Sequence, residues 1–301
     1  MFTLAHLSDP HLAPLPSPHL AELIGKRVTG YINWQRKRRY IHDSAVLEKI
    51  VDDMKRQAPD HIAVTGDLVN IALPDEFAHG RHWLESLGSS HDVTLVPGNH
   101  DAYVRATKHR FAEAWGDYLR GDDAPDGGAT FPSLRRRGPL AIIGITTAEP
   151  MPAHCAAGRI GADQMARLTA LLARTRQEGV CRVVLIHHPP LPGPAADRKQ
   201  LLDSAAFRAA IAAEGAELIL HGHTHRSGLS HLPSPSGGVP VIGVPSASAR
   251  PSHDKDHARY HLYRIAREGG DWRIDVDVRG IGAGLDRFVP ETGFSLRVAA
   301  G

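Results

Sequence analysis

Residues 2–11 read FTLAHLSDPH, an apolar run that ends in Asp9 and His11. Four later stretches have the same form, apolar residues followed closely by Asp, Asn or His: HIAVTGD (61–67), VTLVPGNHD (93–101), VVLIHH (183–188) and ELILHGHTH (217–225). Short apolar runs of this kind are typical of buried strands. In open α/β sheets, side chains that follow the carboxyl ends of parallel strands meet at one crevice. The five stretches therefore predict a single polar site at one rim of the fold.

Helical patterns separate most of these strands. We expect helices at about 42–57, 74–87, 103–119, 162–178 and 204–213. After residue 226 the pattern changes to short strands, which suggests a second and largely antiparallel sheet. Alternating strand and helix units predict an α/β protein. We expect two sheets packed face to face and flanked by helices.

The composition narrows the class of protein to which the chain can belong. Its 301 residues are 42% hydrophobic and 23% charged, as is usual for globular proteins, and the formal net charge is +2. We expect one domain over 1–301, with a basic insertion at about 13–41 and a strand-rich C-terminal part at about 226–301. The small net charge predicts no clear binding of a nucleic-acid polymer. Without a secretory signal or a membrane span at the sequence level, we expect a cytoplasmic protein.

The side-chain types in the five motifs suit divalent metal ions. Any one motif is explained by a turn or a strand end, but five such motifs at five strand ends are hard to explain as coincidence. Carboxylate and imidazole ligands suit Mn, Fe or Zn, and the lack of thiolate argues against a structural zinc site. Two ions about 3.5–4 Å apart share a bridging ligand and lower the pKa of a bridging water, which makes hydroxide available near neutral pH. They also stabilise charge that develops on a phosphoryl group.

The ordered motifs resemble the signature of the calcineurin-like metallophosphoesterase superfamily, which runs D-x-H, G-D, G-N-H-[D/E], H and G-H-x-H. The match spans Asp9 to His225. It implies a four-layer sandwich of two mixed sheets flanked by helices. It also implies two metal ions, the first held by Asp9, His11, Asp67 and His225. The second ion would be held by Asp67, Asn99, His187 and His223.

The resemblance also suggests roles for residues beside the metal ligands. His100 would lie near the leaving-group oxygen, as an acid or a charge-stabilising donor, and Asp101 would orient it. His187 and His188 both compete for one ligand position. In the superfamily this ligand is usually the His directly after the apolar run, so we favour His187.

Within the superfamily, the GNHD, GHTH and HHPP sequences look most like the class III cyclic-nucleotide phosphodiesterases. That similarity implies a phosphodiesterase in which a metal-bridging hydroxide attacks phosphorus, acting on a small phosphodiester or nucleotide. Two alternatives stay open. One is a pyrophosphatase for a lipid precursor of the UDP-diacylglucosamine type. The other is a non-catalytic metal-binding scaffold, although such relatives typically lose ligands and none is missing here.

The basic insertion allows two interpretations. It is either a solvated basic surface or a lid over the metals. As a lid, it would use Arg36, Arg38 and Arg39 to bind phosphate oxygens, and Trp34 would stack on a base or touch an acyl chain. The second interpretation allows contact with a membrane surface through the insertion. A homodimer is a further possibility that the sequence leaves open.

Overall fold

The apolar runs form strands that end at the predicted site residues. The computed structural model describes all residues except 108, 125–129, 192–196, 252–255 and 282–286. The strands that precede the five motifs are β1 (Phe2–Leu7), β2 (His61–Val64), β3 (Val93–Leu95), β6 (Cys181–Leu185) and β7 (Leu218–His221). β1, β2 and β3 run parallel to one another, and so do β6 and β7. All five motifs therefore follow the carboxyl ends of parallel strands.

The first sheet joins the start of the chain to its end. Among the described residues it has six strands in the order β12-β11-β10-β1-β2-β3. Its antiparallel half consists of β10 (Arg259–Glu268), β11 (Asp271–Gly280) and β12 (Val289–Ala299). β10 pairs directly with β1, so these late strands extend the sheet that carries Asp9.

The second sheet has six strands in the described chain, in the order β4-β5-β6-β7-β9-β8. The strands not yet placed are β4 (Ser133–Arg137), β5 (Leu140–Gly144), β8 (Gly228–Ser234) and β9 (Gly237–Gly243). Its four central strands are parallel, and β4 and β8 are antiparallel edges. The prediction that the late strands form a separate, largely antiparallel sheet is therefore wrong. They divide between both sheets, because pairing partners depend on edges that a linear pattern does not reveal.

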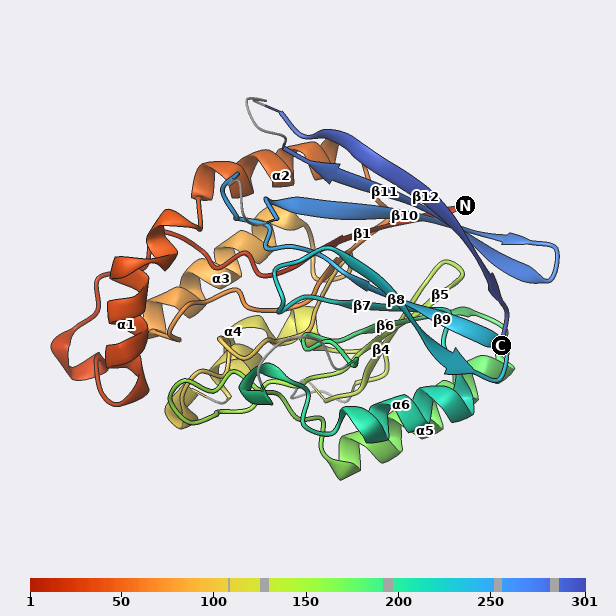
Figure 1. The fold of residues 1–301 in the computed structure, drawn as a ribbon, viewed down its shortest axis with the longest axis horizontal. Helices are drawn as coiled ribbons and strands as arrows, with labels where there is room; N and C mark the ends of the chain where they lie inside the picture. Colours follow the sequence, from red (N-terminus) through yellow and green to blue (C-terminus); the bar gives the residue numbers. More distant parts are fainter. Residues whose placement is uncertain (108, 125–129, 192–196, 252–255, 282–286) are drawn as a thin grey trace.

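Helices cover the outer faces of the two sheets (Figure 1). On the first sheet lie α2 (Ser44–Arg56), α3 (Pro74–Leu87) and α4 (Arg110–Leu119), and on the second lie α5 (Ala162–Gln177) and α6 (Ser204–Glu214). The helix expected at 103–119 is shorter, with a separate 3-10 turn η3 (Arg105–Thr107) before it. Tyr103 is instead buried and stacks on His100, with ring centroids 5.5 Å apart. Another short 3-10 turn, η4 (Asp197–Lys199), precedes α6.

Three hydrophobic clusters separate the four layers. Within β6, Val183 packs between the two sheets while its neighbour Val184 packs under α5 and α6. β5 alternates in the same way, with Ile142 between the sheets and Ile143 outside. Both faces of these strands are buried, which explains why β5 and residues 183–186 are apolar, while the buried Arg182 of β6 pairs with Glu217. The predicted four-layer α/β sandwich is confirmed.

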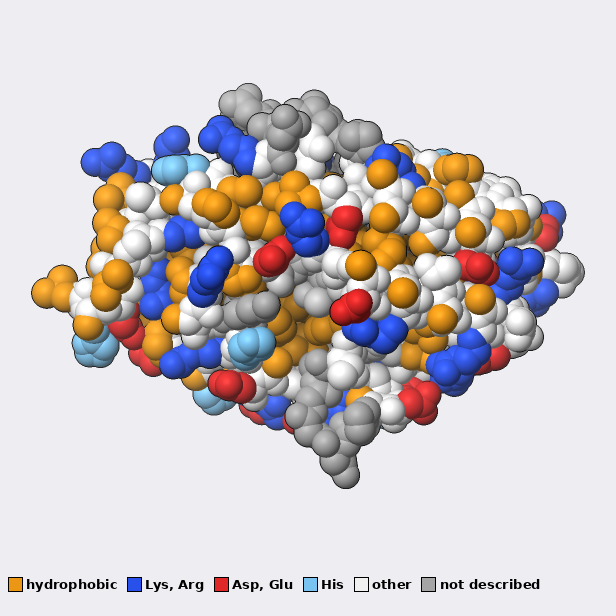
Figure 2. All heavy atoms as spheres, turned by 90° about the horizontal axis from the view of Figure 1, so that it is seen from below, with side chains coloured by type: hydrophobic (Ala, Val, Ile, Leu, Met, Phe, Trp, Pro, Cys, Tyr) orange, Lys and Arg blue, Asp and Glu red, His pale blue; other side chains and the backbone are white. Residues whose placement is uncertain are grey.

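The basic insertion lies at one end of the molecule, opposite both termini (Figure 1). It contains η1 (Leu20–Glu22), α1 (Lys26–Arg36) and η2 (Arg38–Tyr40). Acidic and basic side chains are intermixed over the face shown in Figure 2. None of the helices that the structure describes is long and apolar enough to span a bilayer.

Candidate metal centre

Five predicted metal ligands have a left-handed backbone, which residues other than glycine rarely adopt. Their φ angles are 52° at Asp9, 38° at His11, 59° at Asp67, 67° at His223 and 54° at His225. Such a conformation costs about 1–3 kcal/mol per residue and persists only where the surroundings impose it. Strain of this kind is concentrated at functional sites, so the backbone conformation by itself indicates that this rim is a functional site.

The carboxylate of Asp101 holds the loop of Asp67 in this conformation. Its two oxygens accept backbone hydrogen bonds of 2.8–3.2 Å from four amides, those of Gly98, Asp67, Leu68 and Val69. Burial and the nearby charge of Asp67 raise the pKa of Asp101, and the amide donors oppose this rise. Asp101 therefore builds the turn that presents a predicted bridging ligand.

His100 is oriented by a different group from the one predicted. Its Nδ1 atom donates to the carbonyl oxygen of Asn70 at 2.5 Å. The contacts of Asp101 are to the backbone amides described above, so the role predicted for it, orienting the His100 ring, is not what the structure shows. Asn70 follows β2 by only six residues, but nothing in the sequence indicates that its carbonyl turns toward His100.

The first ligand group consists of Asp9, His11 and His225. The Nε2 atoms of His11 and His225 are 3.3 Å apart, and His225 Nε2 is 3.2 Å from Asp9 Oδ1. Two nitrogen ligands of a four-coordinate ion, each about 2.0–2.1 Å from it, lie about 3.3 Å apart. These three side chains therefore have the separation that a shared metal ion requires.

Asp67 lies between this group and a second one. Its Oδ2 atom is 3.9 Å from His11 Nε2 and 3.4 Å from His187 Nε2. Asn99 Oδ1 is 3.2 Å from the same nitrogen of His187, and the rings of His187 and His223 are 5.1 Å apart. The structure thus brings together all seven predicted ligands, with Asp67 in the position of a bridge.

Backbone carbonyls fix the orientation of three predicted ligand imidazoles. Nδ1 of His11 contacts the carbonyl of Val69 at 3.2 Å, and Nδ1 of His187 contacts that of Thr65 at 2.6 Å. Nε2 of His223 contacts the carbonyl of Lys199 at 3.0 Å. Each carbonyl requires a proton on the nitrogen that faces it, which leaves the other ring nitrogen free to bind metal. This second contact is typical of metal-binding histidines.

His188 differs from His187 in its contacts. Its Nδ1 is 2.7 Å from the hydroxyl of Thr147, and its Nε2 is 3.0 Å from the carbonyl of Ala156. Both ring nitrogens thus have partners, although the three rings of His187, His188 and His223 are close enough for a common ion. These hydrogen bonds leave His188 less available to an ion than His187. The preference for His187 remains a prediction that rests on this geometry.

The electrostatics of the site suit cation binding. Burial lowers the pKa of His11 and of His223, which keeps both rings neutral, and neutral imidazole is the form that binds metal. Burial alone would also lower the pKa of His187, but the negative charge of Asp67 raises it. Burial would raise the pKa of Asp9, but His225 and Ser8 lower it overall. Burial would likewise raise the pKa of Asp67, but His187 and His100 lower it to about 2. Both carboxylates are therefore ionised, and a positive charge between them is favourable.

Two glycines permit the ligands to approach one another. A Cβ atom on Gly98 would collide with the Asp67 carboxylate, and one on Gly222 would collide with the side chains of Ser8 and Asp9. The residue types, the carbonyl contacts and this close packing all fit two divalent ions.

The four residues predicted to bind substrate differ in their positions relative to the metal centre. Only the guanidinium of Arg38 reaches the metal centre, where Nη2 is 2.8 Å from His11 Nε2. Trp34 is buried and stacks on His42, and is thus not available to stack on a base. Arg36 and Arg39 are exposed, and Arg39 bonds to Gln35 and Tyr40.

His42 is a residue of the site that the sequence analysis missed. Its ring centroid is 4.5 Å from that of His11, and its Nδ1 is 2.8 Å from Ser248 Oγ. It is 3% exposed although it follows a stretch rich in arginine. The sequence does indicate a helix cap at Asp43, directly after His42. It does not indicate that His42 is buried, so nothing in it pointed to a place in the site.

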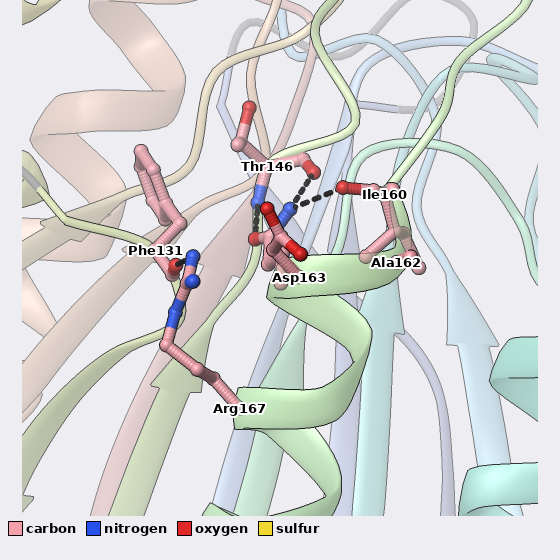
Figure 3. A pocket seen from close by; sticks show the side chains of 8 residues that line it. Phe131, Thr146, Ile160, Ala162, Asp163 and Arg167 are labelled. Carbon is pink, nitrogen blue, oxygen red and sulfur yellow. Dashed lines mark hydrogen bonds between the residues drawn. The ribbon is translucent and has the colours of Figure 1, made fainter.

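A separate pocket of about 450 Å³ lies at the start of α5 (Figure 3). Gln164 bonds to both the amide and the carbonyl of Thr146, and Arg167 donates to the carbonyl of Phe131. These polar groups have partners within the wall, so we assign the pocket no part in the metal centre.

A four-layer α/β sandwich with clustered carboxylates and imidazoles at its strand ends defines a dinuclear metallohydrolase class of protein. Residues 2–227 match the calcineurin-like phosphoesterase family, and the chain belongs to this family.

Two relatives agree with this assignment by sequence, and a solved structure has a similar fold. A probable cyclic nucleotide phosphodiesterase of Synechococcus sp. is 26% identical over 75% of this chain and 80% of its own. The glycerophosphodiester phosphodiesterase GpdQ of Enterobacter lignolyticus is 31% identical over 46% of this chain and 44% of its own. The fold is similar to that of a dimetal phosphatase from Danio rerio, with a TM-score of 0.61 at 14% identity, covering 100% of this chain and 99% of that one.

Proposed function

We propose that this protein is a metal-dependent phosphodiesterase that hydrolyses a small phosphodiester or nucleotide. The observation that carries the proposal is the position of Asp67 Oδ2, between His11 Nε2 at 3.9 Å and His187 Nε2 at 3.4 Å. A carboxylate placed between two imidazole groups suits two adjacent ions. The phosphodiesterase names of the two relatives support the choice of a diester as the substrate.

The proposed ligand sets follow the two groups of side chains. Asp9, His11 and His225 would hold one ion, Asn99, His187 and His223 the other, and Asp67 both. When bound, two such ions supply a water of lowered pKa and polarise the phosphoryl oxygens. Mn, Fe and Zn all accept these donors. The protein contributes by fixing ring orientations through the carbonyls of Val69, Thr65 and Lys199.

His100 is the proposed proton donor for the leaving-group oxygen. Its Nδ1 is engaged by Asn70, so Nε2 is the atom that faces the site and would carry the transferred proton. In the structure this nitrogen lies 2.9 Å from Arg38 Nη1. Burial and then Arg38 lower the pKa of His100 to about 3. An anionic substrate beside the ring would offset the effect of Arg38 and favour protonation.

A second candidate is hydrolysis of a lipid-linked pyrophosphate such as UDP-diacylglucosamine. The observation that favours it is the exposure of several apolar side chains in the insertion, which is the segment that delivers Arg38. The same metal centre would serve either reaction, since both attack phosphorus.

Hydrolysis of a substrate panel by metal-stripped protein refilled with Mn tests both candidates. The panel contains a bis-aryl phosphate, an aryl monophosphate, 2′,3′- and 3′,5′-cyclic nucleotides and UDP-diacylglucosamine. We expect metal-dependent turnover of the diesters that is lost in Asn99→Ala and His100→Ala. Turnover restricted to UDP-diacylglucosamine would replace the first candidate by the second. Two bound ions without turnover of any substrate would contradict both and favour the scaffold.

A further inference from the structure

The insertion exposes its apolar side chains. Leu20 is 90% exposed, Ile24 71%, Ile32 43% and Val28 39%. Val28 and Ile32 are four residues apart and therefore share one face of α1. Figure 2 shows hydrophobic side chains gathered at the end of the molecule that α1 forms in Figure 1.

The opposite face of α1 is anchored by polar contacts. Arg27 Nε donates to the carbonyl of Ile71 at 3.1 Å, and Lys26 Nζ lies 3.3 Å from the carbonyl of Met151. Gly30 packs closely against Tyr103. A surface helix of a globular protein normally buries its apolar face and exposes its charges. α1 buries Trp34 in this way, but it also exposes Val28 and Ile32 while Lys26 and Arg27 contact backbone carbonyls.

Positive charge accompanies the exposed apolar side chains. Residues 20–40 contain six Lys or Arg and a single acidic residue, Glu22. Three of the cations, Arg36, Lys37 and Arg39, are exposed at the end of α1. Apolar side chains next to exposed cations are typical of segments that lie in the interface of an anionic membrane.

We propose that residues 20–40 form a membrane-contact surface that seats the protein on an anionic lipid bilayer. Leu20, Ile24, Val28 and Ile32 enter the boundary between headgroups and acyl chains. Arg36, Lys37 and Arg39 bind the lipid phosphates. Arg38 belongs to the same segment and points the other way, to His100 and His11. Contact through this surface therefore places the metal centre next to the headgroups.

Co-sedimentation with vesicles tests the membrane-contact surface without any turnover. The metal-loaded protein is mixed with vesicles of phosphatidylcholine and phosphatidylglycerol, or of phosphatidylcholine alone. We expect binding to the anionic vesicles that weakens with salt. Ile24→Asp with Ile32→Asp should reduce the partition coefficient at least about tenfold, because each buried isoleucine contributes substantially to partitioning. The control is Leu202→Asp with Leu229→Asp, which are 49% and 46% exposed outside the insertion.

Three outcomes would overturn this inference. Wild-type protein that stays in solution with anionic vesicles would contradict it, as would equal loss of binding in both double variants. Self-association of wild type that is lost only in the Ile24 and Ile32 variant would show that the surface binds a second copy. Metal content and melting temperature confirm that each variant is folded. Since binding is measured apart from hydrolysis, its failure would leave the proposed phosphodiesterase activity untouched.

Discussion

Nη1 of Arg38 lies 2.9 Å from Nε2 of His100, although the two residues are 62 positions apart. The basic insertion thus sends one side chain into the metal centre. The described partners of this guanidinium are the imidazoles of His100 and His11 rather than a carboxylate. A guanidinium that no carboxylate binds directly is suited to donate paired hydrogen bonds to phosphate oxygens.

Arg38→Gln should therefore weaken the binding and turnover of anionic substrates. We expect kcat/KM to fall about 10- to 100-fold, the range for losing a hydrogen bond to a charged group. Inhibition by inorganic phosphate should weaken in parallel. Lys55→Gln removes the same charge from an exposed residue of α2, outside the membrane-contact surface, and serves as the control. Equal effects of the two substitutions would show that Arg38 acts only through general charge.

His187→Ala and His188→Ala should differ in metal content. His187 Nε2 faces Asp67 and Asn99, whereas both nitrogens of His188 have other partners. We expect elemental analysis to find about one ion fewer per chain in His187→Ala. His188→Ala should keep both ions and lose stability instead. Loss of metal in His188→Ala alone would reverse the assignment.

Gly222→Ala should disrupt the first ligand group. The added methyl would collide with Ser8 and Asp9, so Asp9 could not keep its position beside His225. We expect metal affinity to fall by at least about tenfold, as when groups that orient the ligands are lost, measured by competition with a chelator. Gly228→Ala is the matched control, since within the described part of the chain its added methyl meets no atom within 4 Å beyond its own chain neighbours. Equal affinities in the two variants would disprove the close approach.

Asp53 should make the stability depend on pH in acid. Burial alone would raise its pKa, but hydrogen bonds from Arg279 and Tyr260 lower it overall. A lowered pKa means that the stabilisation is present above the unfolded value, about 3.9, and is lost as the pH falls below it. Breaking this buried pair with Asp53→Asn should cost about 3 kcal/mol near neutral pH. In urea unfolding, the difference from wild type should shrink below about pH 4. If the difference in unfolding free energy between wild type and Asp53→Asn did not change with pH, this prediction would be wrong.

Much of the metal centre could be predicted because strand ends are visible in the sequence. Asp9, Asp67 and His225 each come within a few residues of an apolar run. Parallel pairing brings the ends of β1 and β2 together, and the packing of the two sheets brings the end of β7 beside them. The alternation of Val183 and Val184 between two cores likewise follows from a run that is apolar throughout. Local patterns therefore sufficed where position along a strand decides position in space.

Other features depend on contacts between distant segments. The sequence did not distinguish Arg38 from Arg36 and Arg39, because only the packing of α1 determines which of them turns inward. Trp34 appeared suited to stacking on a substrate, but the fold buries it against His42. The partner of His100 is a carbonyl, which every residue has, so no side-chain motif could indicate Asn70.

The left-handed backbone of five metal ligands lowers the stability of the metal-free protein but places the ligands for metal binding. In metal-free protein the backbone is strained at these positions. Glycine would remove the strain at each one, but the substitution would also remove the ligand. Selection for heat resistance without metal should therefore erode the ligand set before it alters the core. With metal present, binding energy offsets the same strain and protects those residues. Metal supply in the environment would then decide whether this rim is retained over evolution.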